Sequence, residues 1–273
     1  MHSTEEILRA AAEWTWFPRG SERDDSELLL VRYPARLGGR VRASQVHSRA
    51  DAATVIEHAV DRTRAWGASE ITFWSNPSDS PDLESELRRR GAEHIDTVAV
   101  FAGAIDAVSI DVPHDATAEV IRTLEQVREA DAINAPVWEQ DPLDEDGLRA
   151  ELADVHEALA SGAGIHVLGR LDGEAVSTGG CTIVDGFTRL WGAATLPTAR
   201  GRGAYRAVLA ERLRLGAERG ATTALVKGRV STSAPILARA GFRHFGDERA
   251  YRLVIPAGST RMPRERASGQ TVP

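Results

Sequence analysis

Cysteine is nearly absent from this chain of 273 residues, in which Cys181 stands alone. A single thiol cannot form an internal disulfide, so the sequence fits a reducing compartment and predicts a cytoplasmic protein. The eight histidines are scattered, and no metal site is predicted. No apolar run reaches the length of about 20 residues that crosses a bilayer, and the N-terminus lacks a signal-peptide core. The sequence therefore predicts no membrane partner.

An excess of positive charge is also missing. The chain has 33 Lys and Arg against 40 Asp and Glu, a formal net charge of -7. This balance argues against a nucleic-acid surface and is compatible with a cationic or amine substrate. Apolar residues make up 42% of the chain, which is enough for a sizeable core in two domains.

The most informative segment is a glycine-containing loop between a strand and a helix. Residues 187–196 are apolar and partly alternating, as in a strand, and Pro197 ends that strand. Gly201 and Gly203 let the backbone approach a ligand, and a helix follows from Ala204. Free amides and the helix dipole favour an anion there, and Arg200 and Arg202 add positive charge. The alternative is a tight turn with two solvated arginines.

This loop lacks the Gly-x-Gly-x-x-Gly order of dinucleotide folds and the Gly-Lys-Ser/Thr of P-loops. It resembles the pyrophosphate loop of the GNAT (GCN5-related N-acetyltransferase) superfamily, Arg/Gln-x-x-Gly-x-Gly/Ala. Arg200, Gly203 and Tyr205 fall on the three defining positions. Tyr205 departs from the pattern, because the family has a small residue there, and its side chain must lean away from the phosphates.

The order of the following elements strengthens the resemblance. A strand is predicted at 222–227, then a helix with Ser233 as N-cap and Pro235 in its first turn, then Gly241 and a final strand pair at 243–248 and 249–255. The resemblance spans residues 117–256. It implies an α/β (α+β) fold with a mixed, mostly antiparallel sheet flanked by helices.

An internal repeat suggests a tandem of two copies, the first of them partial. Residues 51–65, 70–74 and 81–91 match 204–218, 223–227 and 233–241, with Ala59 opposite Arg212 as a mismatch. Any two helix–strand units look somewhat alike, which is the alternative. The tandem interpretation predicts a degenerate GNAT-like domain at 1–106, a linker at 102–116, a catalytic domain at 117–256 and a disordered tail at 257–273.

The first copy is predicted to bind no CoA. Residues 47–50 stand opposite the glycine loop and contain no glycine, and Asp51 would repel phosphate while capping its helix. This copy also includes a hairpin of strands 28–33 and 40–46. Trp14, Trp16 and Phe17 are predicted to be core rather than cleft residues.

The second copy is predicted to open with a strand at 119–124 and a helix at 125–134. A loop bounded by two prolines follows at 135–142, then a helix at 144–159 and a hairpin of strands 165–170 and 175–184.

By resemblance, the acyl donor is acetyl-CoA. Its pyrophosphate would lie on the loop Arg200–Tyr205, against the amides of Arg202, Gly203, Ala204 and Tyr205. Its pantetheine arm would pair with Ala193 and Thr195, and a hydroxyl such as Ser233 would add a contact. The acceptor amine, a small molecule or a peptide, would attack the thioester directly in a ternary complex. Oligomeric state stays open between monomer and homodimer.

Catalytic residues stay unassigned. Leu237 stands where the family often has the tyrosine that protonates the thiolate, and no acidic residue lies between Leu190 and Leu196. Glu139 and Asp141 could border the acceptor but are more simply solvated, and His166, Cys181 and Tyr251 favour structural roles. The prediction is an acyl-CoA-dependent N-acetyltransferase. The alternatives are a CoA-binding pseudoenzyme, a different acyl group or nucleophile, and, less favoured, a nucleotide-binding module.

Overall fold

The computed structural model describes residues 2–77, 79, 81–230 and 233–256. The predicted tail, 257–273, lies outside these residues. The N-terminal half comprises α1 (Thr4–Ala12), β1 (Glu22–Asp25), β2 (Leu28–Arg32), β3 (Val41–Val46), α2 (Ala52–Ala65), β4 (Glu70–Ser75), α3 (Asp82–Arg89) and β5 (Glu93–Ala104). The short helix η1 (Ala35–Leu37) joins β2 to β3.

The C-terminal half repeats the plan with additions. It comprises β6 (Ala116–Val120), α4 (Leu124–Trp138), α5 (Glu145–Ser161), β7 (Gly164–Leu171), β8 (Glu174–Val184), β9 (Phe187–Thr195), η2 (Pro197–Ala199), α6 (Ala204–Glu218), β10 (Thr223–Arg229), α7 (Ala234–Arg239) and β11 (Arg243–Val254). The described strands form one sheet in the order β1-β2-β3-β4-β11-β5-β10-β9-β8-β7-β6. Only β3–β4 and β9–β10 pair in parallel, which confirms the predicted mixed, mostly antiparallel fold.

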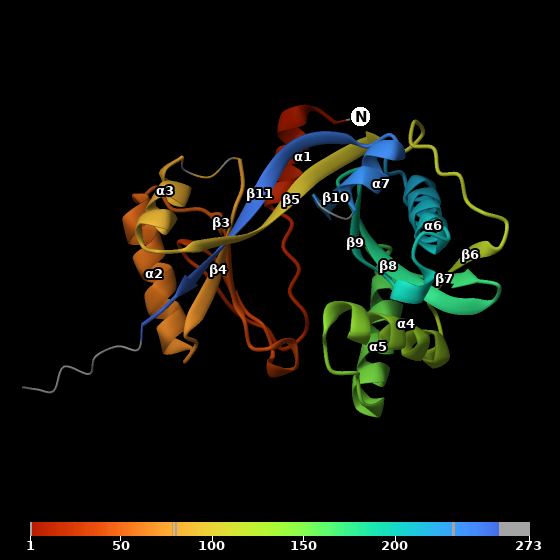
Figure 1. Ribbon diagram of the computed structural model, residues 1–273, viewed down its shortest axis with the longest axis horizontal. Coiled ribbons are helices and arrows are strands. Elements are labelled where there is room, and N and C mark those ends of the chain that lie inside the picture. Colours follow the sequence, from red (N-terminus) through yellow and green to blue (C-terminus); the bar gives the residue numbers. More distant parts are fainter. Residues whose placement is uncertain (1, 78, 80, 231–232, 257–273) are drawn as a thin grey trace, which may run out of the picture.

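The two halves exchange their last strands. β5 leaves the N-terminal half and pairs with β10, while β11 leaves the C-terminal half and pairs with β4. The two long strands also pair with each other, and Figure 1 shows them side by side between the halves. Ala102 opposes Arg243 just as Arg252 opposes Glu93, so the register is symmetric about the pair Val98–Glu248. The repeat is therefore a pseudo-twofold arrangement whose axis passes through the pair Val98–Glu248.

Helices of the repeat cover one face of the sheet, here called the back face. α2 and α3 pack on Ile71, Phe73 and Tyr251 in the N-terminal half. α6 and α7 pack on Leu190, Ala224 and Val226 in the C-terminal half. Successive strand residues point to opposite faces, so Thr72, Trp74, Arg189, Leu225 and Lys227 belong to the other, front face.

The front face is covered in part. α1 packs through Ile7, Ala10 and Ala11 on Val100 and Leu225, among other residues. α4 and α5 pack on the C-terminal half, where Ile133 and Val155 join Leu168 and Ala194 in another apolar cluster.

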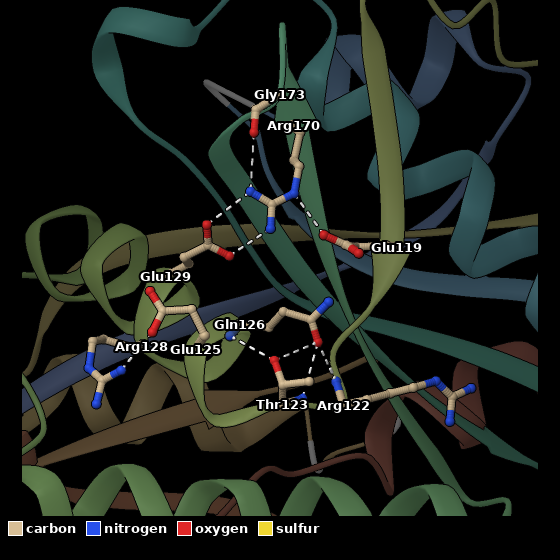
Figure 2. A network of polar contacts seen from close by, with 9 residues as sticks. All are labelled: Glu119, Arg122, Thr123, Glu125, Gln126, Arg128, Glu129, Arg170 and Gly173. Atoms are coloured by element: carbon tan, nitrogen blue, oxygen red, sulfur yellow. Dashed lines mark hydrogen bonds and ion pairs between the residues drawn. The ribbon is translucent and has the colours of Figure 1, made fainter.

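A polar network fixes α4 to the sheet (Figure 2). Arg170 of β7 binds both oxygens of Glu129, at 2.9 and 2.7 Å, and Glu119 of β6 at 2.7 Å. Thr123 caps the helix, accepting from the Gln126 amide at 3.3 Å, while the Gln126 side chain accepts from the Thr123 amide. α4 is therefore held against β6 and β7 through Glu129, while its first turn is closed by its own cap.

Four sequence predictions about elements were wrong. The final strand pair is one strand, β11, because each of its halves pairs with a different region of β5 and β4. Strand 119–124 lies earlier, as β6, since Thr123 is a helix cap. Strand β5 continues to Ala104, inside the predicted linker. α4 passes through Pro136, where burial of Ile133 and Ala135 outweighs the loss of one helix hydrogen bond.

Two aromatic residues predicted to be core are exposed. Trp16 and Phe17 are 52% and 39% exposed, whereas Trp14 is partly buried against α1. Both exposed rings lie in the segment 13–21, which joins α1 to β1. Trp16 stacks on Tyr33, whose hydroxyl donates to the Trp16 carbonyl at 3.2 Å, and Phe17 lies under Arg23. Both rings therefore lie at the surface, Trp16 against Tyr33 and Phe17 against Arg23.

Candidate functional site

The glycine loop follows β9 as the sequence predicts. The strand ends at Thr195, η2 makes one turn, and α6 begins at Ala204. Gly201 and Gly203 have φ values of 78° and 102°, in the region that favours glycine. Within the described residues, no acceptor faces the amides of Gly201, Arg202, Gly203, Ala204 or Tyr205. Several amides at one helix N-terminus are thus available to an anion.

Arginine side chains surround this loop. Arg200 Nε donates to the Thr195 carbonyl at 3.3 Å, so the side chain folds back on the strand. Arg202 lies 3.1 Å from Asp172, and Arg206 lies 3.5 Å from Asp111. The pairs are exposed and weak, so an anionic ligand can compete for these guanidinium groups.

Gly203 is required for packing as well as for its backbone conformation. A Cβ atom added there would lie 2.4 Å from Pro113 Cγ, in the segment between β5 and β6. A valine at 203 would therefore shift the backbone, and it would not separate ligand binding from folding. Gly201 has no neighbour within 4 Å of such an atom, so it is the better position for a test.

In the equivalent loop of the N-terminal half, an acidic side chain occupies the start of the helix. Asp51 caps α2, accepting from the Thr54 amide at 2.8 Å, and that hydrogen bond lowers the pKa of the Asp51 carboxyl. A cavity of about 140 Å³ lies beside it, lined by Val46, Ser48, Ala50, Ala52, Val55, Asp79 and Leu83. Burial raises the pKa of Asp79 to about 6. Near neutral pH both carboxylates would repel a phosphate.

Strands β9 and β10 separate before the chain reaches the loop. They pair only from Phe187–Thr223 to Leu190–Val226, and β9 then has an irregularity opposite Thr178–Gly180. Ala193 and Thr195 follow that point, so the β10-facing edge of their backbone makes no strand pairing within the described residues. An extended ligand could pair there, as the resemblance implies.

Ser233 precedes α7 but does not cap it with its side chain. Its hydroxyl donates instead to the Arg229 carbonyl at 3.5 Å, and the neighbouring Ser231 and Thr232 lie outside the described residues. The side chain faces Gly228, because a Cβ atom there would lie 3.0 Å from Ser233 Oγ. Ser233 therefore stays near the end of β10 that pairs with β5 but no longer with β9.

Arg212 is a buried arginine that sequence reasoning noted only as a mismatch with Ala59. It is 1% exposed, and its Nη1 donates to the carbonyls of Gly180 and Trp191 at 3.1 and 3.3 Å. A Cβ atom at Gly179 would lie 3.0 Å from that nitrogen and 3.4 Å from Ala193 Cα. Arg212 thus supports β8 and β9 where β9 leaves β10.

We expect Arg212→Lys to lower the free energy of unfolding by about 1–2 kcal/mol. Lysine keeps the charge but has one nitrogen, whereas Arg212 uses Nη1 for the Gly180 and Trp191 carbonyls and Nε for the Val208 carbonyl, so at least one carbonyl loses its donor. Urea denaturation measures the change. The control is Arg214→Lys on the same helix, an exposed position with ion pairs to Glu211 and Glu218, where a change below about 0.5 kcal/mol is expected. Equal effects at the two positions would contradict the supporting role.

Several residues considered as catalytic candidates are buried in the core or bonded to other side chains. Burial lowers the pKa of His166 to about 4, and its ring packs edge-on against Trp191 at 4.8 Å. Tyr251 is buried and donates to Glu84 at 2.7 Å, and Leu237 is buried in the core of the C-terminal half. Glu139 and Asp141 are exposed. His166 lies beside the separation of β9 and β10, because Trp191 is the first residue of β9 beyond the pairing, but its low pKa keeps the ring uncharged and unable to act as an acid near neutral pH.

The Cys181 thiol is expected to be unreactive in the folded protein. Its side chain is fully buried, and burial raises its pKa to about 11, so the reactive thiolate is scarce at pH 8. Titration with Ellman's reagent at pH 8 should give no labelling of the native chain while the urea-denatured chain reacts fully. Rapid stoichiometric labelling in native buffer would show that the site opens.

Comparison with known proteins places the fold. No family model and no curated protein matches the sequence. Solved structures do match, and one is a GCN5-related N-acetyltransferase from Kribbella flavida, with a TM-score of 0.63 and 22% identity over 92% of this chain and 96% of that one. Another, from Sphaerobacter thermophilus, has a TM-score of 0.65 and 18% identity over 94% and 87%.

A third match is a tandem GNAT protein from the clavulanic acid biosynthesis pathway. Its TM-score is 0.63, with 14% identity over 92% of this chain and 88% of that one. The chain therefore has the fold of GCN5-related N-acetyltransferases in a tandem arrangement, as the resemblance implied. Among the described helices, none has the length and apolar character needed to span a membrane.

Proposed function

We propose that this protein is an acyl-CoA-dependent N-acyltransferase that moves an acetyl group from acetyl-CoA to an amine. The observation that carries the proposal is the contrast between two equivalent helix N-termini. The N-cap of α6 is Gly203, which has no side chain to cap the helix, and the amides around it are unpaired. The N-cap of α2 is Asp51, whose carboxylate accepts from the Thr54 amide. One half is thus prepared for a pyrophosphate and the other is not.

Binding would use the residues that the loop presents. The pyrophosphate would bind the amides of Arg202, Gly203, Ala204 and Tyr205, with Arg200 and Gly201 completing the loop, and the pantetheine arm would run along Ala193 and Thr195 near Ser233. The CoA-binding unit would be residues 117–256, and residues 1–106 would bind no CoA. The single buried cysteine suits a cytoplasmic protein.

The reaction joins the acceptor nitrogen to the thioester carbon and breaks the carbon–sulfur bond. The amine must be neutral to attack and loses a proton to water or a base, while the sulfur leaves as a thiolate or takes up a proton. Because Leu237 cannot donate a proton, positioning of the two reactants would supply most of the rate enhancement. Backbone amides of β9 would stabilise the oxyanion.

Calorimetric titration with acetyl-CoA tests the proposal. Micromolar binding at one site per chain is expected, together with acetyl-CoA-dependent release of free CoA when amines are added. Binding without turnover over a broad amine panel would favour the CoA-binding pseudoenzyme. Absence of both heat and thermal stabilisation would reject the acyl-CoA site.

A further inference from the structure

A row of cationic side chains crosses the front face of the sheet at its centre. Arg42 of β3, Lys227 of β10 and Arg189 of β9 lie on this face and are called the basic row. Thr72 opposes Arg42 in register as Leu225 opposes Arg189, so the two arginines are related by the pseudo-twofold. In a chain with a net charge of -7, three positive groups on one partly buried face require a reason.

The protein compensates one of the three charges. Lys227 Nζ lies 2.8 Å from Glu248, with side chains only 16% and 4% exposed, and it also donates to the Trp14 carbonyl at 3.1 Å. Burial lowers the pKa of Lys227, Glu248 opposes that shift, and the charges of Arg42 and Arg189 lower the pKa further. Both arginines therefore act on the same buried ammonium.

The other two charges are left unpaired. Within the described part of the chain, neither Arg42 nor Arg189 makes a hydrogen bond or an ion pair, and the Nε atom of each is buried without a partner. Glu13 and Asp185 attract Arg189 but do not pair with it. The Arg42 Cζ atom lies over the Trp74 ring, 4.8 Å from its centroid. Guanidinium groups without protein partners are suited to binding a carboxylate or phosphate.

The location connects this row to the acyl-transfer site. Lys227 is the first residue of β10 beyond its pairing with β9, so its side chain stands on the front face where the two strands separate. The loop Arg200–Tyr205, by contrast, lies at the start of α6, a back-face helix. An acceptor approaching the thioester from the front would meet the basic row.

From these contacts we infer that the acceptor is an acidic amine, whose carboxylate or phosphate binds beside Lys227 between Arg42 and Arg189. The inference rests on the proposed acyl transfer. It reverses the expectation from net charge, because the local field is opposite in sign to that of the whole chain. The acceptor molecule would carry its carboxylate or phosphate at one end, bound to the basic row, and its attacking nitrogen at the other end, near the thioester.

The test uses melting temperatures of the full chain in sodium phosphate, sodium malonate and sodium chloride at matched ionic strength. Saturating CoA is present throughout. If the glycine loop binds CoA, it is then occupied, and phosphate or malonate cannot act there. Wild type should melt at least about 2 °C higher in one of the two anions than in chloride, and the larger shift identifies phosphate or carboxylate as the preferred group. Arg42→Gln and Arg189→Gln should each lose more than half of that shift.

The control is Arg252→Gln on β11, an arginine paired with the exposed Glu93, which should keep the full shift. In chloride the two basic-row variants should melt no lower than wild type, because each removes repulsion. Equal anion shifts in wild type and both basic-row variants would overturn the inference. That result is independent of calorimetry with acetyl-CoA, which tests the proposed function separately.

Turnover gives a second readout on matched acceptors. Glucosamine 6-phosphate is compared with glucosamine, and an α-amino acid with its amide. The acidic member of a pair should be acetylated at least tenfold faster, and Arg189→Gln should remove that preference. Faster acetylation of the neutral members would also overturn the inference.

Discussion

Glu248→Ala is expected to lower the free energy of unfolding by about 3–5 kcal/mol, because it leaves a buried ammonium without its counter-ion. The Glu248 carboxylate lies 2.8 Å from Lys227 Nζ. The Trp14 carbonyl and ring also contact Lys227, but neither carries a charge. The other charged groups that act on Lys227 are Arg42 and Arg189, and both repel it. No other group is placed to neutralise the charge within the described residues.

The double variant Glu248→Ala, Lys227→Met should recover most of that loss, since methionine removes the charge and keeps a similar apolar volume. Glu93→Ala is the matched control, because Glu93 also pairs with a cationic side chain of a neighbouring strand, Arg252, but is 64% exposed, and it should cost less than about 1 kcal/mol. Urea denaturation measures all three. A cost below about 1 kcal/mol for Glu248→Ala would mean that water reaches Lys227 and that the pair is not buried in solution.

Features set by a few neighbouring residues were predictable from the sequence. The loop before α6 is one, because glycines, a preceding proline and a following helical stripe all lie within a short segment. The Asp51 cap of α2 is another, and both helices end alike, at Gly67 and Gly220 with φ values of 74° and 82°. Such local choices depend on backbone sterics and capping rather than on distant partners.

Strand partners could not be read in the same way. Nothing within Arg243–Val254 specifies that its neighbours are β4 and β5, since pairing depends on which apolar faces are covered once the whole chain collapses. The sequence predicted two strands that meet between Glu248 and Arg249, whereas β11 runs through that point and has its register shifts at His244–Gly246 and Ala250–Tyr251. The exchange of β5 and β11 between the halves is therefore a property of the tertiary structure.

The basic row was missed for the same reason. Arg42, Arg189, Lys227 and Glu248 come from four strands that are distant in the sequence, and each is an ordinary residue in its own strand. Arg212 did leave a signal, because the repeat places a charged residue opposite Ala59 in an apolar stripe. A mismatch of that kind in an internal repeat marks a position where the two copies have different roles.

The sharpest test of the glycine loop is the pair Gly201→Asp and Gly201→Asn. Gly201 has a φ of 78° and open space around it, and Asp and Asn are the residue types that best tolerate this conformation. The two variants differ by one charge at nearly constant shape. A carboxylate about 5 Å from a doubly charged pyrophosphate costs about 2–3 kcal/mol at an effective dielectric constant of about 40–80. Acetyl-CoA should therefore bind Gly201→Asp roughly 30- to 150-fold more weakly than Gly201→Asn.

Calorimetry on both variants measures this difference, and circular dichroism melting verifies that they fold. Gly67→Asp supplies the control, because Gly67 has a similar φ of 74°, has open space around it and follows the equivalent helix of the other half. Its affinity for acetyl-CoA should equal that of wild type. If Gly201→Asp and Gly201→Asn bound acetyl-CoA equally well, the pyrophosphate would not lie on this loop. A loss that appeared only with aspartate at position 201 would locate the anion site at the start of α6, by charge rather than by shape.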